Sequence, residues 1–253
     1  MKANPKRRTE IAKREEPVRL VALSDGLFAT VLTLLVLDLR IPDAIHAEAG
    51  GMAVFLKWLG PHLFSYLLTF FVAGTYWLAH HRDFDYIIHY DRRLLGYNLL
   101  FLLFIGLLPF STASISQVGF SNGAYPTYWA IYCANIILAG ILLTLTWGYA
   151  MSHGQVVPET TREQSRHIIL RQMTTPAVFL ISIGAEYLFP QAFLGPYTLL
   201  AIPLVQWSVD RFYGHAESMG QPARAGWADL LWRAGASLVW ILLIAFAVWA
   251  MTL

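Results

Sequence analysis

Residues 20–39 read LVALSDGLFATVLTLLVLDL, an apolar run whose polar members are one serine, two aspartates and two threonines. A helix of about 20 predominantly apolar residues is long enough to cross the hydrocarbon core of a bilayer. The run lacks the alternation of period two that marks the strands of a membrane barrel, so we expect a helix. This stretch therefore predicts a membrane-spanning helix and an integral membrane protein.

The remainder of the chain repeats this pattern. Hydrophobic residues make up 57% of the sequence and charged residues 13%, whereas about a quarter of the residues of a soluble domain are charged. Six further apolar runs cover residues 55–78, 94–110, 125–151, 168–189, 193–209 and 234–253. We therefore expect an all-α, polytopic helical membrane bundle of seven spans. Six spans are the alternative, because the run at 193–209 is short and contains Pro203.

The domain organisation follows from where charge, glycine and proline gather. Residues 1–18 are rich in both signs of charge, which predicts a solvated cytoplasmic leader. Residues 214–226 hold three glycines and a proline, which is typical of a linker. We therefore expect a six-helix transmembrane domain over residues 19–213 and an appended transmembrane helix over residues 227–253.

Basic residues are distributed unevenly between the two ends of the predicted spans. Those expected on one side are Lys2, Lys6, Arg7, Arg8, Lys13, Arg14, Arg19, Arg82, Arg92, Arg93, Arg162, Arg166, Arg171, Arg211, Arg224 and Arg233. Only Arg40 and Lys57 fall on the other side. By the positive-inside rule this asymmetry predicts a cytoplasmic N-terminus.

Polar side chains in the predicted spans raise the question of which groups satisfy them. A charged side chain such as Asp25 costs about 2.5–3.5 kcal/mol at the centre of a membrane helix and normally faces protein or water. At the same depth the second run ends with Trp77, His80 and His81. We expect the indole N–H or a histidine to donate to Asp25, with Asn98 of the third run nearby. A position of Asp25 near the membrane interface is an equally open interpretation.

The first run also presents a stripe that mixes one hydroxyl with apolar bulk. Thr30, Leu34 and Leu37 share one side of the helix, because residues three and four apart lie on the same face. In a lone helix such a stripe indicates ordinary core packing. If several copies of the helix surrounded an axis, the same residues would form rings along a pore, with the leucines constricting it.

Other patterns that carry chemistry are weak. His81, Asp85 and His89 share a predicted helical face and resemble a metal-ligand set, but we expect this helix end to be solvated and expect no metal. Glu186 is expected to be wet, near an interface. We find no nucleotide-binding loop and no nucleophile motif, so we expect neither an enzyme nor a cofactor, and no nucleic-acid partner.

One stretch resembles a known family. Residues 19–26, RLVALSDG, are similar to the R-x-x-x-F-S-D signature that opens the endosomal and lysosomal potassium channel family, in particular its short prokaryotic members. The resemblance continues in three successive runs, through Ala29, Thr33, Leu34, Leu35, Leu37 and Leu39, through Trp77, His80 and His81, and through Asn98, Pro109, Phe110 and Thr112. It covers roughly residues 19–211.

The resemblance implies a subunit of six helices, a homotetramer, and a potassium-selective pore lined by the first helix in a prokaryotic membrane. The implied pore-facing residues are Thr30, Leu34 and Leu37. The implied polar network that holds the pore helix consists of Arg19, Ser24, Asp25, Trp77 and His80 or His81, with Asn98 close by. Potassium is the implied ion, with other monovalent cations or protons as alternatives.

Two positions depart from the family pattern. Leu23 stands where the signature has phenylalanine, and Thr30 stands where the first pore-lining residue is usually isoleucine. A ring of threonines hydrates where a ring of isoleucines would expel water, so the narrowest point shifts to Leu34 or Leu37. Two other hypotheses stay open: a proton pathway that uses Asp25 and His80 or His81, and a membrane scaffold that conducts nothing.

Overall fold

The computed structural model of the chain describes residues 5–39, 51–118, 123–189, 194–199 and 201–217. Within these ranges the regular elements are helices, and one isolated bridge pairs Ile87 with Val156. The helices are α1 (Pro5–Leu35), the 3-10 helix η1 (Val36–Leu39), α3 (Gly51–Tyr86), α4 (Arg92–Gly106), α5 (Leu108–Val118), α6 (Tyr125–Ser152), α7 (Arg162–Leu188), α8 (Leu194–Thr198) and α9 (Ala201–Glu217). The all-α class is confirmed.

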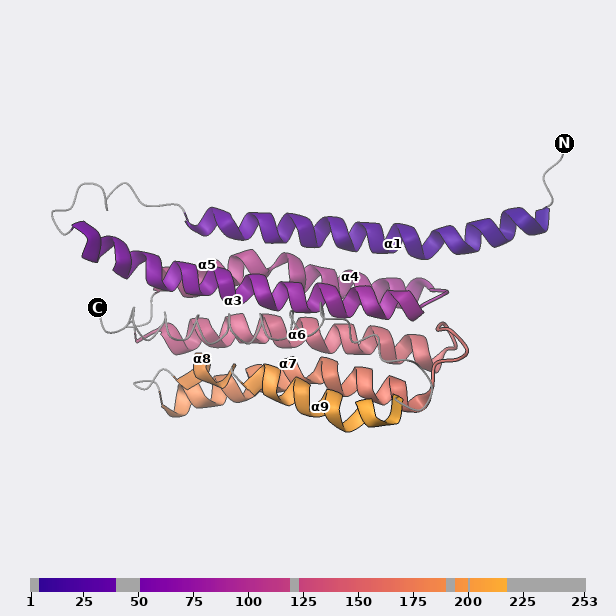
Figure 1. Cartoon of the computed structure of the whole chain (residues 1–253). Helices are drawn as coiled ribbons and strands as arrows, with labels where there is room; N and C mark the ends of the chain where they lie inside the picture. The colour runs from indigo at the N-terminus through magenta and orange to yellow at the C-terminus, as the bar shows by residue number, and fades with distance from the viewer. Residues whose placement is uncertain (1–4, 40–50, 119–122, 190–193, 200, 218–253) are drawn as a thin grey trace.

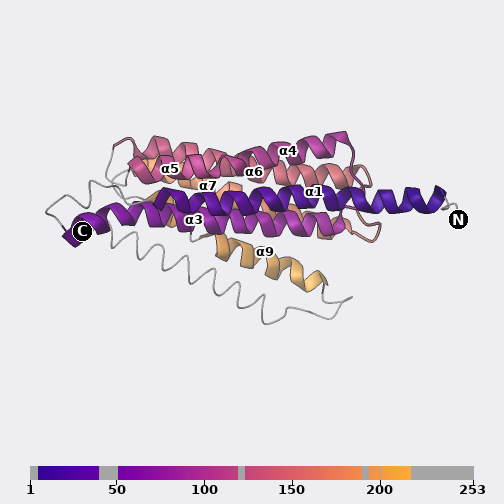
Figure 2. The same cartoon turned by 90° about the horizontal axis from the view of Figure 1, so that it is seen from above.

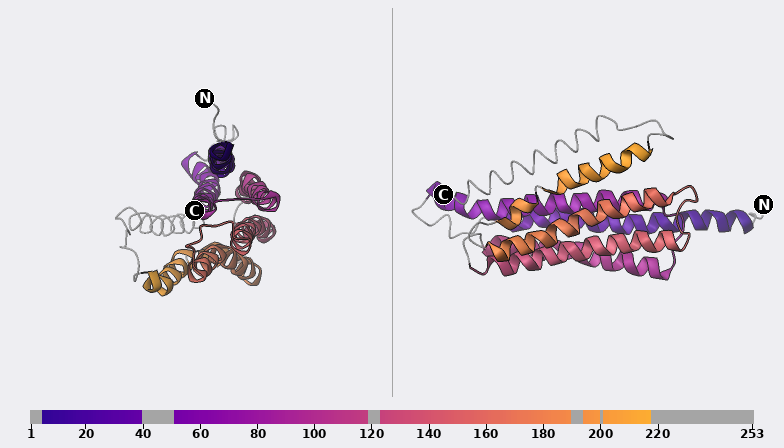
Figure 3. Two further views of the ribbon diagram at one scale, coloured as in Figure 1. Left: turned by 90° about the vertical axis from the view of Figure 1, so that its right-hand side faces the viewer. Right: turned by 90° about the horizontal axis from the view of Figure 1, so that it is seen from below.

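The long helices lie side by side along one axis (Figure 1). Seen along this axis, α1 lies at one edge of the bundle and α7 and α9 lie at the opposite edge (Figure 3). Among the described residues, five helical stretches are long and apolar enough to cross a membrane, namely Val18–Leu39, Val54–Tyr86, Arg92–Val118, Tyr125–Ser152 and Arg162–Leu188. The prediction of a polytopic membrane bundle therefore agrees with the described part of the chain.

The first and third predicted spans differ in detail from the helices. We expected the first helix to begin after Pro17, but α1 is continuous from Pro5, since the lysines, arginines and glutamates before Pro17 are good helix formers. The run at 94–110 forms α4 and α5, which break at Leu107 and together make one span. Pro109 accounts for the break, because it lacks an N–H and fits best in the first turn of a new helix.

The sixth predicted run, residues 193–209, does not form one continuous helix. It divides into the five-residue α8 and the seventeen-residue α9, and neither is among the five stretches found long and apolar enough to span. Pro203 lies in the first turn of α9, where proline is tolerated. α9 lies obliquely on the outside of the bundle (Figure 2). Arg40, residues 218–226 of the predicted linker and the predicted helix at 227–253 lie outside the described residues.

The centre of the bundle is α6, which packs against α3, α4, α5 and α7. Its buried side chains include Trp129, Tyr132 and Trp147. Tyr76 of α3 donates a hydrogen bond from its hydroxyl to the carbonyl of Ile136 at 2.8 Å. α3 and α6 are thus joined by a polar contact deep in the bundle.

The turn between α3 and α4 separates the three residues that resemble a metal-ligand set in the sequence. α3 ends at Tyr86, so His89 does not share a helical face with His81 and Asp85 as we had predicted. Asp91 instead caps α4 by accepting from the N–H groups of Arg93 and Leu94, and it accepts the Tyr149 hydroxyl at 2.6 Å. The Leu94 N–H, followed by the Tyr149 hydroxyl, lowers the pKa of Asp91 below its usual value. Asp91 is therefore a structural cap.

Candidate functional site: the exposed face of the first helix

The membrane-spanning part of α1 has one buried and one exposed face. Leu20, Ser24, Phe28, Val31 and Leu35, at spacings of three and four residues, are all less than 5% exposed and pack toward α3, α4 and α5. The opposite face is not covered by the other described helices, which lie on one side of α1 (Figure 3). Among the described residues, the side chains that pack against α1 therefore lie on one side of the helix.

The residues that we predicted to line a pore are exposed, Thr30 and Leu34 on α1 and Leu37 on the 3-10 helix η1 that follows it. Thr30 is exposed, and Leu34 and Leu37 are 43% and 48% exposed. The hydroxyl of Thr30 donates to the carbonyl of Gly26 at 2.8 Å, which leaves oxygen lone pairs as acceptors on the helix surface. The exposed face therefore offers apolar bulk at two levels and a cation-compatible oxygen at a third.

Two hydrogen-bonded groups join α1 to its neighbours. The indole N–H of Trp77 donates to Asp25 Oδ1 at 2.8 Å. Asn98 Nδ2 donates to the Ser24 hydroxyl at 3.3 Å, and Asn98 Oδ1 lies 2.9 Å from His80 Nε2. Both groups connect the first helix to α3, and the second also connects it to α4.

His80 occupies an aromatic enclosure behind α1. Its ring is fully buried and stacks on Phe84 at 4.4 Å and on Phe101 at 5.6 Å between centroids. No hydrogen-bond partner for its Nδ1 occurs among the described residues. Of the two predicted histidines, His80 therefore contacts the network, whereas His81 is exposed and stacks on Trp77 at 5.7 Å.

Arg19, the first residue of the predicted network, is exposed. The hydrogen bonds among the described residues join Ser24, Asp25, Trp77, His80 and Asn98 and do not include it. The structure therefore brings together five of the seven predicted network residues.

Two buried carboxylates were not anticipated. Asp83 is 2% exposed and both of its oxygens accept from Gln172 Nε2, at 2.9 and 2.7 Å. Glu186, which we expected to be wet, is 1% exposed and accepts the backbone N–H of Gly195 at 2.9 Å. The interpretation of Glu186 as wet is wrong, because Gly195 of α8 covers it, whereas His81, Asp85 and His89, which we expected to be solvated, are exposed. Asp83 is covered by Gln172 of α7. The burial of Asp83 and Glu186 could not be predicted from their positions in the sequence.

The polar network predicts a measurable asymmetry between Asn98 and Ser24. Asn98→Ala removes the side chain that joins α1 to His80, so we expect a loss of about 1–3 kcal/mol in the free energy of unfolding. Ser24→Ala is expected to cost less, since the Ser24 hydroxyl proton is used within its own helix, on the carbonyl of Leu20. Denaturant titration in mixed micelles measures both. Equal costs for the two variants would contradict a bridging role of Asn98.

The histidine, cysteine and acidic side chains of the described residues do not gather into a metal site. No cluster of three histidine, cysteine, aspartate or glutamate side chains able to hold a metal ion occurs in the described part of the chain. What the site offers is a helix face and the contacts that position it.

Comparison with known proteins finds similar sequences that are named as ion channels. Residues 19–109 match the model of the family described as endosomal/lysosomal potassium channel TMEM175. A protein named potassium channel from Streptomyces collinus is 27% identical over 188 residues, which cover 74% of this chain and 90% of that protein. A protein from Rattus norvegicus named endosomal/lysosomal proton channel TMEM175 is 28% identical, and the match covers 79% of this chain but 41% of that protein.

The fold also has a solved counterpart. The crystal structure of a lysosomal potassium-selective channel TMEM175 homologue from Chamaesiphon minutus matches with a TM-score of 0.67 and 22% identity, covering 78% of this chain and 99% of that one. At this identity the match establishes the shared fold. The resemblance expected from the sequence is therefore confirmed: this chain is similar to proteins named as potassium channels and as TMEM175 channels, and its residues 19–109 match the model of that family.

Proposed function

We propose that this chain is a subunit of a cation channel, with potassium as its principal ion, and that the exposed face of α1 lines the pore. The observation that carries this proposal is the division of α1 into a buried face that holds it and an exposed face with Thr30 and Leu34, which is followed by the exposed Leu37 in η1. The relatives named as potassium channels support the choice of ion.

A pore of this kind needs several copies of the chain. α1 lies at the edge of the bundle and packs against α3, α4 and α5 on one side. Closed rings of identical subunits place the same residue of each copy around one axis. We propose a homotetramer, in which Leu34 and Leu37 form apolar constrictions and Thr30 forms a ring of hydroxyl oxygens.

Conduction through such rings is passive. Apolar constrictions control hydration of the path, while oxygen ligands replace part of the hydration shell of an ion. Neither step involves a covalent change, so the channel requires no nucleotide and no cofactor. The contacts of Asp25 with Trp77 and of Ser24 with Asn98 fix the rotation of α1 about its own axis. This rotation turns Leu34 and Leu37 toward the central axis of the tetramer.

The placement in the membrane follows from charge and from the relatives. Arg82, Arg92, Arg93, Arg162 and Arg166 lie at the end of the bundle from which the N-terminal part of α1 extends. By the positive-inside rule we assign this end to the cytoplasm. Since similar proteins occur in bacteria, we assign the channel to a prokaryotic cell membrane.

A proton pathway is the second candidate. The animal relatives carry the name proton channel, and His80 lies buried beside Asn98, close behind Asp25 and Ser24 of α1. A histidine and a carboxylate at one depth are groups that relay protons.

Purified protein in liposomes, with potassium, sodium and proton gradients imposed one at a time, decides between these functions. We expect potassium flux that exceeds sodium flux and persists in Asp25→Asn. Proton flux without potassium flux, lost in Asp25→Asn, would establish the second candidate. Absence of flux under every gradient would contradict both and leave the scaffold hypothesis.

A further inference from the structure

A hydrogen bond ties the 3-10 helix η1, which follows α1, to α5. The hydroxyl oxygen of Ser116 on α5 lies 2.5 Å from Asp38 Oδ2. Ser116 is 2% exposed, and Asp38 is half-buried. The same hydroxyl lies 3.0 Å from the carbonyl oxygen of Ala113, but a serine has one proton to donate. The carboxylate is charged and closer, so it accepts this hydrogen bond.

The Ser116 hydroxyl is the contact that holds the Asp38 carboxylate. Among the described residues, Asp38 has no second hydrogen-bond donor and no ion pair. The nearest basic residue along the chain, Arg40, lies outside the described residues. Loss of the Ser116 hydroxyl therefore removes the polar contact that joins η1 to α5.

The turn held in this way carries Leu37, which directly precedes Asp38. η1 runs from Val36 to Leu39. A 3-10 helix has about 3.0 residues per turn where an α-helix has about 3.6, so the direction in which Leu37 points depends on which form this turn takes. The internal hydrogen bonds of a 3-10 helix have poor geometry. A side-chain contact to a neighbouring helix therefore helps to decide the form of the turn.

We propose that Asp38 is a positioning residue for the outer constriction of the channel. By accepting the hydrogen bond of Ser116, it holds η1 in its 3-10 form and thereby keeps Leu37 directed toward the pore axis. This inference rests on the proposed function, because Leu37 forms a constriction only if copies of α1 surround a pore. Asp38 acts through Leu37 and does not itself contact the ion.

Hydrogen–deuterium exchange of the full chain in detergent micelles tests whether the contact holds η1. Ser116→Ala removes the donor, so we expect the backbone amides of residues 36–39 to exchange about ten-fold faster, as the loss of one hydrogen bond to a charged group predicts. Ser114→Ala is the matched control on α5, because the Ser114 hydroxyl donates within its own helix, to the carbonyl of Phe110 at 2.9 Å. Equal exchange in the two variants would overturn the role of Ser116 in holding η1.

Potassium efflux from liposomes tests whether the contact positions Leu37. Ser116→Ala and Asp38→Ala are each expected to raise the flux about three-fold, less than truncation of a constriction, because the leucine is displaced but not removed. The double variant is expected to match either single variant, since both lose the same contact. Asp38→Asn keeps an acceptor oxygen and is expected to retain most of the wild-type behaviour. In a Leu37→Ala background, Ser116→Ala is expected to have no further effect.

Three flux results would overturn the positioning role. The first is unchanged flux in Ser116→Ala. The second is an equal rise on Ser116→Ala with and without Leu37, which would indicate a general structural effect. The third is a loss of flux in Asp38→Asn without any effect of Ser116→Ala, which would assign to Asp38 the attraction of cations by its charge. Absence of flux in wild type would overturn the channel and its constriction together, while the exchange rates would still decide whether Ser116 holds η1.

Discussion

Leu34→Ala is expected to raise the potassium flux of the reconstituted channel by about ten-fold. The leucine is exposed on α1, and in a ring of subunits it would present apolar bulk to the ion path. Removing that bulk widens the path and lets water enter, which lowers the barrier for a hydrated ion. A reduction of about 1.4 kcal/mol is enough for a ten-fold change in rate. Leu37→Ala is expected to act in the same direction.

The control for this prediction is an equally exposed leucine on another helix. Leu145 of α6 is 48% exposed, as Leu37 is, and its truncation is expected to leave flux unchanged. Potassium efflux from loaded liposomes, at equal protein content, gives the comparison. Unchanged flux in both Leu34→Ala and Leu37→Ala would contradict the assignment of these residues to a pore.

Gly140→Ala is expected to destabilise the protein by about 1–3 kcal/mol, the usual cost of an extra methyl group in a filled core. Gly140 lies where α6 crosses α3 and α7. A Cβ atom at this position would lie 2.7 Å from the Tyr76 hydroxyl and 3.0 Å from Pro176 Cδ. Neither neighbour retreats readily, since Tyr76 is hydrogen-bonded to Ile136 and the ring of Pro176 is fixed to its backbone.

Gly148 provides the comparison on the same helix. A Cβ atom there would meet no heavy atom within 4 Å, so Gly148→Ala is expected to be neutral or to stabilise the helix by up to about 1 kcal/mol. The free energy of unfolding of both variants is measured in mixed micelles. If Gly140→Ala were as stable as Gly148→Ala, this result would contradict the close packing of α6 against α3 and α7 at Gly140.

The helices, and the residues of the first span that share one side, follow from sequence, because both depend on local rules. The residue pattern of that stripe alone indicated core packing, whereas the stripe is exposed. Apolar runs of sufficient length predicted the stretches that α1, α3, α6 and α7 occupy, and spacings of three and four residues placed Thr30, Leu34 and Leu37 on one face. The contact of Trp77 with Asp25 was anticipated by their common depth. The depth of a residue in the membrane follows from its distance along the chain to the end of its helix, and this distance can be counted in the sequence.

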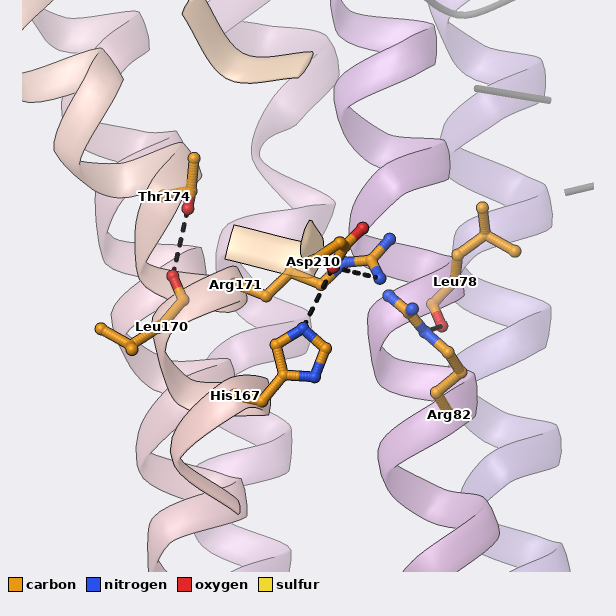
Figure 4. A network of polar contacts seen from close by, with 7 residues as sticks. All are labelled: Leu78, Arg82, His167, Leu170, Arg171, Thr174 and Asp210. Carbon is orange, nitrogen blue, oxygen red and sulfur yellow. Dashed lines mark hydrogen bonds and ion pairs between the residues drawn. The ribbon is translucent and has the colours of Figure 1, made fainter. Parts of the chain in front are cut away.

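Contacts between segments that are distant in the sequence could not be predicted from such local rules. Asp83 and its partner Gln172 are 89 residues apart, and no pattern along the chain pairs them. The burial of Glu186 depends on how α8 lies against α7, and the ion pair between Arg171 and Asp210 depends on how α9 lies against α7 (Figure 4). The division of the sixth run into two helices likewise reflects tertiary packing, which overrides a hydropathy pattern that predicts one.

The most direct test of the pore is the accessibility of Thr30 to a charged, water-soluble thiol reagent. Cys133 is the sole cysteine of the chain and is fully buried, so a new thiol reports on its own position. We predict that Thr30→Cys channels lose potassium flux when treated, while Leu145→Cys channels on the outward face of α6 do not. Flux in Thr30→Cys that is insensitive to the reagent, with the thiol unmodified, would contradict a pore lined by α1.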